Sequence, residues 1–403
     1  MATGYRPEWV QGAFVDFVGS RLHPFWSLKI PKIRLLSRHR LSNDLIALQF
    51  EINQAFRQQV RTLRSGWQGG QYLNLSVCID GVYHQRSYSL VGLPEQSLWW
   101  HDDIIGNKAG KNKTHPTITI AIKPQGLVSD YLTKRMPLGM TINSGLPSGT
   151  FTLAQALLAQ QTRSTIDVQS PLKKSTSLLF IAGGSGITPM LGLITQALQY
   201  GHPVTLLHYN RTVLLQSQWQ QLATEYPDFT YHLIDTEDTS TYLAGTRHLN
   251  ADSLLSLNLP LADTQIFACG SPALLAGLYK AAADISLPQG KQLRDNIIIE
   301  SFGSALSDLN NEQSDKKTTL DAQTVYLRAR QRQFSGDTTL LTAAEKAGIR
   351  LTHGCRQGIC QLCRCPKISG VVRNIQTGKL SSDGEEFIQT CINVAMTDVV
   401  LDV

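Results

Sequence analysis

Four cysteines near the C-terminus restrict what this chain can fold into more than any other feature. Cys355, Cys360 and Cys363 follow a C-x4-C-x2-C spacing, and Cys391 lies far downstream. A short loop of three thiolates with a distant fourth is a ligand arrangement of [2Fe–2S] clusters. Glycines within the loop give its backbone the freedom to wrap around such a cluster. The spacing therefore predicts one [2Fe–2S] cluster bound by these four cysteines.

Two other interpretations of the cysteines remain. Thiolates also bind zinc, and Cys360-x2-Cys363 could form half of a zinc knuckle. Structural zinc sites usually combine two C-x2-C pairs, and this region has one. A fifth cysteine, Cys365, is expected to be a buried neighbour and not a ligand.

The cysteine loop carries a family resemblance. The segments 336–341 and 353–363 together resemble a plant-type ferredoxin. The resemblance covers residues 324–403. It implies a β-grasp fold for this part of the chain and a one-electron carrier close to its surface.

Length and composition limit the remaining possibilities. A chain of 403 residues is long enough for two to four domains. Its net charge of +6 is too small to indicate nucleic-acid binding, but it suits an acidic protein partner or an anionic cofactor. No apolar run approaches the roughly 18 residues of a membrane span, and the first ten residues lead into no signal-peptide core. Because the cysteines cluster as a metal site would, we expect a reducing compartment and a cytoplasmic protein.

The sequence before the cysteines shows two different patterns of apolar residues. Residues 31–153 contain short alternating runs, such as Tyr72–Val77 and Ile118–Ile122, separated by Gly and Pro. This pattern predicts an antiparallel barrel or sandwich. Residues 178–303 alternate short apolar strands with helices, which predicts a parallel sheet covered by helices on both faces. The overall fold class is therefore multidomain α/β and β.

Polar segments separate these regions. Residues 101–115 and 154–177 are predicted to be surface loops or insertions, and 304–323 a linker to the ferredoxin-like part. Residues 1–30 form an N-terminal extension rich in aromatic residues. Within it, Val10, Phe14, Phe17 and Val18 could share one face of a helix.

A flavin signature lies in the barrel region. A flavin nucleotide needs a cation for its pyrophosphate and a flat ring against the isoalloxazine. Arg86 and Tyr88, at alternating strand positions, offer both on one face. The Arg-x-Tyr-Ser sequence resembles the flavin motif of the ferredoxin–NADP reductase superfamily. That resemblance implies that Arg86 contacts phosphate, Tyr88 stacks on the ring and Ser89 lies near N5, with Tyr72 in the same cofactor site.

The second half of the same motif follows in the barrel. Gly126, Leu127, Val128 and Ser129 resemble the turn whose amides receive the flavin diphosphate, an anion site at the start of a helix. This turn favours FAD over FMN, although FMN-dependent relatives share the domain order.

A glycine-rich turn after the strand at 178–182 indicates a nicotinamide nucleotide. Glycines at the start of a helix let a pyrophosphate approach the backbone. The sequence is not the G-x-G-x-x-G fingerprint, because a proline takes the place of the last glycine. It resembles the Gly-Ser-Gly-Ile-Thr-Pro segment of the same reductases, and the alternative is a structural strand–helix turn. The predicted binding residues are Gly183, Gly184, Ser185, Gly186, Thr188 and Pro189.

The choice between NADPH and NADH depends on the end of the next strand. The acid expected about 20 residues after the glycines, which would hold a ribose 2′-hydroxyl, is missing. Arg211 stands at the end of that strand and could meet a 2′-phosphate. We therefore favour NADPH over NADH, with a solvated loop arginine as the alternative.

Two further motifs belong to the resemblance. Cys269-Gly270-Ser-Pro resembles the Cys-Gly-Pro motif that faces the nicotinamide in these reductases, and Glu300-Ser-Phe302 resembles their closing Glu-x-Phe. The resemblance implies that Ser89, Cys269 and Glu300 form the catalytic redox centre and that Gly270 and Phe302 contact cofactor. The alternatives are inert packing for the cysteine and a helix cap or surface position for the glutamate.

The order of motifs is flavin, nicotinamide, then cluster. It resembles the reductases of bacterial oxygenases and acyl desaturases. This implies an oxidoreductase in which a nicotinamide donates two electrons, a flavin divides them, and the cluster carries single electrons to a partner. We expect a membrane fatty-acid desaturase or hydroxylase as the acceptor. The alternatives are a soluble ring-hydroxylating or phenylacetate-type oxygenase, or a non-catalytic electron-transfer or redox-sensing subunit.

The N-terminal extension bears on the choice of partner. Its segment 23–27 resembles that of desaturase-associated reductases, which suggests peripheral docking to a membrane enzyme. We expect, however, that the aromatic residues of the extension pack on the barrel.

Overall fold

The computed structural model describes residues 12–62, 66–94, 96, 98, 116–156, 176–237, 247–302, 323–353, 358, 362–375 and 380–403. The chain forms two compact units, Met1–Glu300 and Ser301–Val403. The predicted loop at 101–115, most of the predicted insertion at 154–177 and most of the predicted linker at 304–323 lie outside the described residues.

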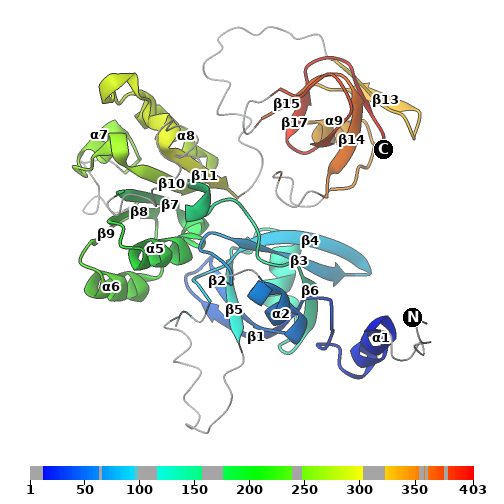
Figure 1. Ribbon diagram of the computed structural model, residues 1–403, viewed down its shortest axis with the longest axis horizontal. Helices are drawn as coiled ribbons and strands as arrows, with labels where there is room; N and C mark the ends of the chain where they lie inside the picture. Colours follow the sequence, from blue (N-terminus) through cyan, green and yellow to red (C-terminus); the bar gives the residue numbers. More distant parts are fainter. Residues whose placement is uncertain are drawn as a thin grey trace, which may run out of the picture. The chain divides into compact units, whose positions relative to one another are not determined.

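The first sheet of the larger unit confirms the predicted antiparallel barrel (Figure 1). Its strand order is β4-β3-β6-β1-β2-β5, and a bridge between Leu90 and Ile120 joins its two edges. Alternate side chains such as Leu48, Phe50 and Leu73 are fully buried inside it, as strand periodicity requires. The strands are β1 (Lys32–Arg40), β2 (Ile46–Ile52), β3 (Tyr72–Ile79), β4 (Val82–Ser89), β5 (Thr117–Ile122) and β6 (Thr141–Ser144).

Short helices accompany the barrel. Helix α2 (Gln54–Thr62) places Phe56, which is fully buried, into the barrel core. The short helix α3 (Leu127–Asp130) continues into a π-helical turn, η3 (Tyr131–Arg135). Val128 and Leu132 from these two turns are buried in the same core, so the turn predicted to receive the flavin diphosphate is fixed to the barrel.

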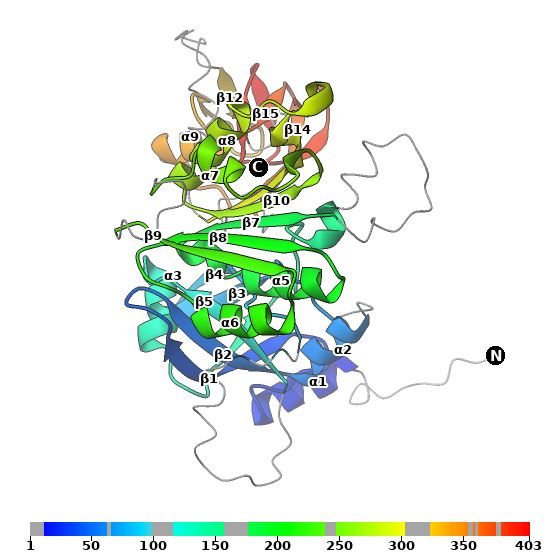
Figure 2. The same cartoon turned by 90° about the vertical axis from the view of Figure 1, so that its left-hand side faces the viewer.

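The second sheet of the larger unit confirms the predicted parallel α/β domain. Its order is β11-β10-β7-β8-β9, and the pairs β10–β7, β7–β8 and β8–β9 are parallel. Helices α5 and α6 lie on one face and α7 and α8 on the other (Figures 1 and 2). The elements are β7 (Leu178–Gly183), α5 (Met190–Gln199), β8 (Val204–Asn210), α6 (Gln216–Glu225), β9 (Phe229–Asp235), α7 (Ala251–Leu255), β10 (Gln265–Gly270), α8 (Pro272–Ala283) and β11 (Ile297–Ser301).

The smaller unit has a mixed sheet that packs against one helix, as predicted for a β-grasp domain. Its order is β13-β12-β18-β14-β16, and β12 pairs in parallel with β18. The side chain of Thr339 caps helix α9 by accepting a hydrogen bond from the Thr342 amide. The elements are β12 (Thr324–Leu327), β13 (Arg332–Ser335), α9 (Leu340–Lys346), β14 (Arg364–Ser369), β15 (Val372–Asn374), β16 (Glu386–Gln389), β17 (Asn393–Ala395) and β18 (Val399–Leu401).

The N-terminal extension contains a helix, α1 (Gly12–Leu22), but its apolar face does not pack as expected. Phe14 is 47% exposed and Phe17 is 58% exposed. The helix is attached through other contacts: the Trp26 ring covers Gly19, and Asp16 accepts hydrogen bonds from the Ser27 hydroxyl and the Leu28 amide. Val10 lies outside the described residues. Among the described helices, none is long and apolar enough to cross a membrane.

Candidate active site

The paired strands β3 and β4 carry the predicted flavin residues. Tyr72 lies directly opposite Ser89, and Leu75 lies opposite Arg86. Tyr72 and Ser89 are buried, whereas Arg86 is exposed and donates a hydrogen bond of 2.7 Å to the carbonyl of Gln85. Tyr88 is half-buried against the barrel core, and this burial raises the pKa of its phenol. The hairpin thus brings four predicted residues to one strand pair.

Two predicted catalytic residues have buried polar atoms without a hydrogen-bond partner among the described residues. They are the Ser89 hydroxyl oxygen and the Glu300 Oε2 atom. Such orphaned groups cost on the order of 1–3 kcal/mol each. A cofactor with hydrogen-bonding edges, as an isoalloxazine has, would satisfy them. The donor set therefore fits a flavin.

Glu300 and Cys269 form one electrostatic pair on the adjacent strands β11 and β10. Burial raises the pKa of Glu300 to about 8. Burial raises the pKa of the Cys269 thiol well above its usual range, and an ionised Glu300 would raise it further. Both groups are therefore protonated at neutral pH, so neither of them places a buried charge in the predicted redox centre.

The predicted diphosphate turn has space in front of its backbone. A Cβ placed on Gly126 would meet nothing within 4 Å. The Ser129 hydroxyl accepts hydrogen bonds of 2.9 Å from the amides of Gln125 and Gly126, which fixes the turn. Leu127 is 51% exposed, whereas Val128 is buried. The turn is thus open to a ligand on one side and anchored to the barrel on the other.

The predicted nicotinamide turn lies at the topological switch point of the parallel sheet. Strand β7 has β8 on one side and β10 on the other, and ligands of such sheets bind outside the strand ends at this point. A Cβ on Gly186 would lie 2.1 Å from the Cys269 carbonyl oxygen, and one on Gly270 would lie 3.2 Å from Gly183 Cα. Gly184 has a φ of +54°, in the left-handed region. The glycines thus bring the ends of β7 and β10 into backbone contact.

The remaining members of this turn lead into helix α5. Gly184–Ile187 form a 3-10 turn, Thr188 is buried, and Pro189 precedes the first residue of the helix. Proline suits this place because its missing amide would have no partner within the helix. The amide-rich start of α5 therefore follows directly on the strand end, as a pyrophosphate site requires.

Sequence reasoning missed His208, a buried residue beside this turn. It lies opposite Ala182 on β8 and is 1% exposed. It makes a hydrogen bond to the backbone of Gly184, and its Nε2 atom has no partner among the described residues. Burial lowers the pKa of His208 to about 4, so the ring is neutral at pH 7. Only the pairing of β7 with β8 reveals its position.

Arg211 has an acidic neighbour that the sequence did not indicate. Its Nε atom lies 3.4 Å from Glu237 Oε1, and the side chains are 78% and 70% exposed. Glu237 follows β9, the strand beside β8. The ends of the neighbouring strands β8 and β9 thus place a cation for a 2′-phosphate and an acid for a 2′-hydroxyl within reach of each other.

The described part of the cluster site holds two of the four predicted ligands. Cys363 and Cys391 are 3% and 4% exposed, and their sulfur atoms lie 3.0 Å apart. The amide of Gly358 donates to the Cys391 sulfur over 3.3 Å. Cys355 and Cys360 lie outside the described residues, and the described residues contain no group of three metal ligands. Converging soft sulfurs with an amide donor fit an iron–sulfur cluster.

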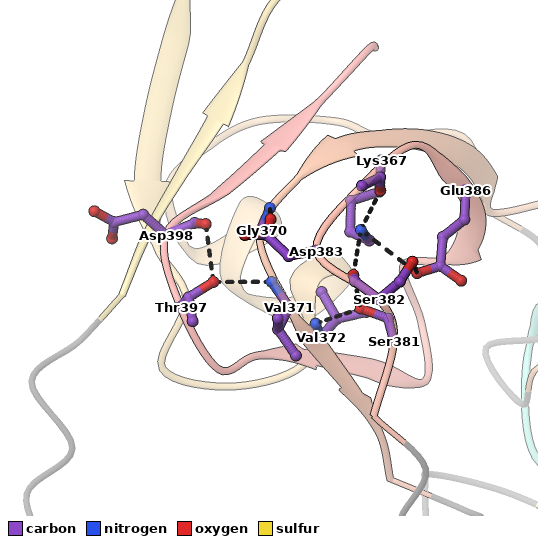
Figure 3. A network of polar contacts seen from close by, with 11 residues as sticks. Lys367, Gly370, Val371, Val372, Ser381, Ser382, Asp383, Glu386, Thr397 and Asp398 are labelled. Atoms are coloured by element: carbon purple, nitrogen blue, oxygen red, sulfur yellow. Dashed lines mark hydrogen bonds and ion pairs between the residues drawn. The ribbon is translucent and has the colours of Figure 1, made fainter.

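A buried lysine, Lys367, joins two segments that lie between these cysteines in the chain, and Figure 3 shows its contacts with Ser382 and Glu386. Lys367 is fully buried on β14, and its ammonium donates to the carbonyls of Ser382 at 2.9 Å and Gly384 at 2.5 Å. It also lies 3.5 Å from a Glu386 carboxylate oxygen. Strand β14 follows Cys363, and β16, which begins at Glu386, precedes Cys391. Lys367 therefore ties together the two segments that present the ligands.

Cys365 and Phe302 are the two remaining residues that the sequence analysis singled out. Cys365 is buried on β14, opposite Ile388; burial and the charge of Cys363 raise the pKa of its thiol to about 12. Phe302 is half-buried directly after β11, beyond the boundary of the larger unit.

Comparisons with known proteins agree with this arrangement. Residues 180–280 match the family model for an oxidoreductase NAD-binding domain, and residues 325–395 match that for a 2Fe-2S iron-sulfur cluster binding domain. The chain is 24% identical, over 94% of its length and 86% of the relative's, to a Mycobacterium tuberculosis protein named NADPH oxidoreductase. It is 25% identical to one of the subunits of the 1,2-phenylacetyl-CoA epoxidase of Escherichia coli, over 94% of this chain and 97% of that one.

A solved structure shares the fold. An intact type IV self-sufficient cytochrome P450 monooxygenase aligns with 93% of this chain at a TM-score of 0.55 and 19% identity. The aligned part is 41% of that larger protein. The predicted set of cofactors, FAD, NAD(P)H and one [2Fe–2S] cluster, is confirmed.

Proposed function

Because the chain belongs to the ferredoxin–NADP reductase superfamily, among the flavin reductases with a C-terminal [2Fe–2S] domain, we propose that it is the reductase component of an oxygenase. It takes electrons from NADPH and delivers them singly to a soluble partner. The observation that carries this function is the joint presence of orphaned buried groups on β4 and β11, a nucleotide turn at the switch point, and converging cysteine sulfurs.

The oxygenase is favoured over the desaturase that we expected first. A relative that aligns over nearly the full length of both chains is named as part of an epoxidase acting on phenylacetyl-CoA. Its name supports the phenylacetate-type alternative. The exposed helix α1 by itself does not identify a membrane partner, because amphipathic surface helices also bind proteins.

The chain's residues support the reaction by position. Bound FAD would accept a hydride and release single electrons. Ser89 and Glu300 present hydrogen-bonding groups to that cofactor, and the protonated Glu300 can donate. Cys269 remains a neutral thiol at the end of β10, so it can pack against a nicotinamide without attacking it.

The nicotinamide nucleotide is held at the start of α5. Gly183, Gly184 and Gly186 place no side chain in the turn, so a pyrophosphate can reach its amides. Arg211 would bind the 2′-phosphate of NADPH in competition with its ion pair to Glu237. The presence of Arg211, and not its pairing with Glu237, supports NADPH as the preferred donor.

The partner can be tested by product formation. The holoprotein and NADPH would be combined either with a purified phenylacetyl-CoA-type epoxidase oxygenase in solution or with a fatty-acid desaturase in lipid vesicles. We expect oxidised product with the oxygenase. Product with the desaturase and none with the oxygenase would contradict the proposed partner and support a membrane desaturase as the acceptor.

A further inference from the structure

Three glycines bring the barrel and the parallel sheet of the larger unit into backbone contact. A Cβ on Gly192, in the first turn of α5, would lie 2.9 Å from the Gly92 carbonyl oxygen and 3.0 Å from Gly69 Cα. A Cβ on Gly69 would lie 2.3 Å from the carbonyl carbon of Gly192. Because the obstructing atoms at Gly69 and Gly192 are main-chain atoms, a larger residue at either position cannot be accommodated by a rotamer change, and Gly92 contributes its carbonyl group to the contact. We call Gly69, Gly92 and Gly192 the glycine contact.

Hydrogen bonds hold the glycine contact together from both sides. The Gly69 amide donates to Gln196 Oε1 over 3.2 Å. Gln96 donates from Nε2 to the Thr195 hydroxyl over 2.9 Å and accepts from the Leu93 amide over 2.9 Å. Each bond to α5 starts from a loop of the barrel and ends within one turn of Gly192. The two domains are therefore held at one spacing by backbone contact as well as by side chains.

The glycine contact adjoins both predicted cofactor sites. Gly69 lies just before Tyr72, at the start of β3, and Gly92 lies just after Ser89, at the end of β4. Gly192 lies just after the nucleotide turn that ends at Pro189. A displacement here would therefore move the flavin strands relative to the helix start that receives the nicotinamide nucleotide.

We propose that the glycine contact sets the distance between the nicotinamide and the flavin. The three glycines are positioning residues, because they act through the strands and the helix and touch no reacting atom. The proposal rests on the proposed function. Hydride transfer needs reacting atoms about 3–3.5 Å apart, and a misplacement of 1 Å can cost about 100-fold in rate. A spacing set by backbone atoms meets that tolerance better than one set by long side chains.

The test is Gly192→Ala, which adds one methyl group at the contact. The methyl would push α5 away from Gly92, while the nucleotide turn itself keeps its residues. We expect the rate of flavin reduction at saturating NADPH to fall at least 10-fold and the Kd for NADP⁺ to change less than 3-fold. Gly277→Ala in the interior of α8 is the matched control, because it gains the same helix propensity and meets only the Leu249 carbonyl oxygen, at 3.3 Å. It should retain the wild-type rate.

A second measurement needs no bound cofactor. Hydrogen exchange of the Gly69 amide, which is bonded to Gln196, should accelerate at least 10-fold in flavin-free Gly192→Ala and stay unchanged in Gly277→Ala. Thr195→Val removes only the hydrogen bond to Gln96 and keeps the side-chain volume. It is therefore the replacement test variant if Gly192→Ala does not fold. We expect it to slow flavin reduction about 3-fold with NADP⁺ affinity unchanged.

Three results would overturn the spacing proposal: a wild-type rate of flavin reduction in Gly192→Ala, an equal loss of rate and of NADP⁺ affinity, or unchanged exchange of the Gly69 amide. If Gly192→Ala does not fold, a wild-type rate in Thr195→Val would overturn it. A wild-type protein that binds FAD but is reduced by neither nicotinamide would instead contradict the proposed function, and the exchange measurement would still decide whether the contact holds the domains together.

Discussion

The sulfur atoms of Cys363 and Cys391 lie 3.0 Å apart, although the two residues come from opposite ends of the β14–β16 region. The separation exceeds the roughly 2.05 Å of a disulfide bond, and both side chains are buried. Two thiols so close together in an apolar surrounding are the arrangement expected of ligands that share a metal.

Replacing Cys391 by Ser should remove the cluster and leave the flavin. We expect cluster iron and its visible absorption to fall by more than 80%, and electron delivery to cytochrome c to fall about 100-fold. Reduction of ferricyanide, which can accept electrons directly from a flavin, should stay within 2-fold. Cys365→Ser is the matched control, and it should retain the cluster. Loss of iron in Cys365→Ser with retention in Cys391→Ser would reverse the ligand assignment.

The buried ammonium of Lys367 predicts a second effect on the smaller unit. Lys367→Met removes the donor to the carbonyls of Ser382 and Gly384 and the ion pair to the partly exposed Glu386, so we expect a loss of about 1–3 kcal/mol from the unpaired acceptors. Thermal melting followed by the visible circular dichroism of the cluster should show the loss. Lys346→Met is the control, because its 3.2 Å pair with Asp337 is half-exposed and worth about 0.5 kcal/mol. Equal effects of the two substitutions would show that the Lys367 network does not support the cluster.

Much of this site could be predicted because its chemistry lies in short contiguous segments. The turn from Gly183 to Pro189 needs glycines for close approach and a proline at the start of a helix, and both are visible in the sequence. The same is true of the cysteine spacing. The alternation of apolar residues likewise indicated both sheets of the larger unit, because strand and helix periods differ.

The features that the sequence did not reveal depend on which strands are neighbours. His208 meets Gly184 because β8 pairs with β7, and Glu237 meets Arg211 because β9 pairs with β8. Phe14 and other apolar residues of α1 follow a helical period whether or not a surface covers them, so their exposure could not be foreseen. The glycine contact also joins segments 100 or more residues apart in the chain.

The raised pKa of Glu300 predicts a stability that depends on pH. The folded protein keeps this proton up to a pKa of about 8, whereas the unfolded chain releases it near pH 4.5, so stability falls as pH rises between these values. Glu300→Gln removes the titrating carboxyl group and with it this loss of stability at high pH. In urea unfolding of the flavin-free protein, the variant should gain on the order of 2 kcal/mol over wild type on going from pH 5 to pH 8.

A control separates this effect from general charge removal. Glu225→Gln removes an exposed carboxyl at the end of α6, so its difference from wild type should be the same at both pH values. If Glu300→Gln also shows a constant difference, then Glu300 is ionised in the folded protein and the proposed neutral redox centre is wrong.

The ion pair between Arg211 and Glu237 predicts the choice of nicotinamide. Arg211→Ala should lower kcat/KM for NADPH about 10-fold, which corresponds to about 1.4 kcal/mol, and leave that for NADH within 2-fold. Glu237→Gln releases Arg211 and should raise the preference for NADPH about 2-fold to 3-fold. Steady-state ferricyanide reduction with each nucleotide measures both. An equal loss with NADPH and NADH in Arg211→Ala would place Arg211 outside the 2′-phosphate site.

The central claim is that one chain carries electrons from a nicotinamide through a flavin to a cluster. Anaerobic titration of the holoprotein with NADPH, followed by visible absorption, tests it most directly. The flavin absorption should bleach first and the iron–sulfur absorption afterwards, with about 1.5 equivalents of NADPH for the three electrons that one flavin and one cluster accept. Bleaching by dithionite with no response to NADPH or NADH would contradict it and leave the chain a non-catalytic electron-transfer protein.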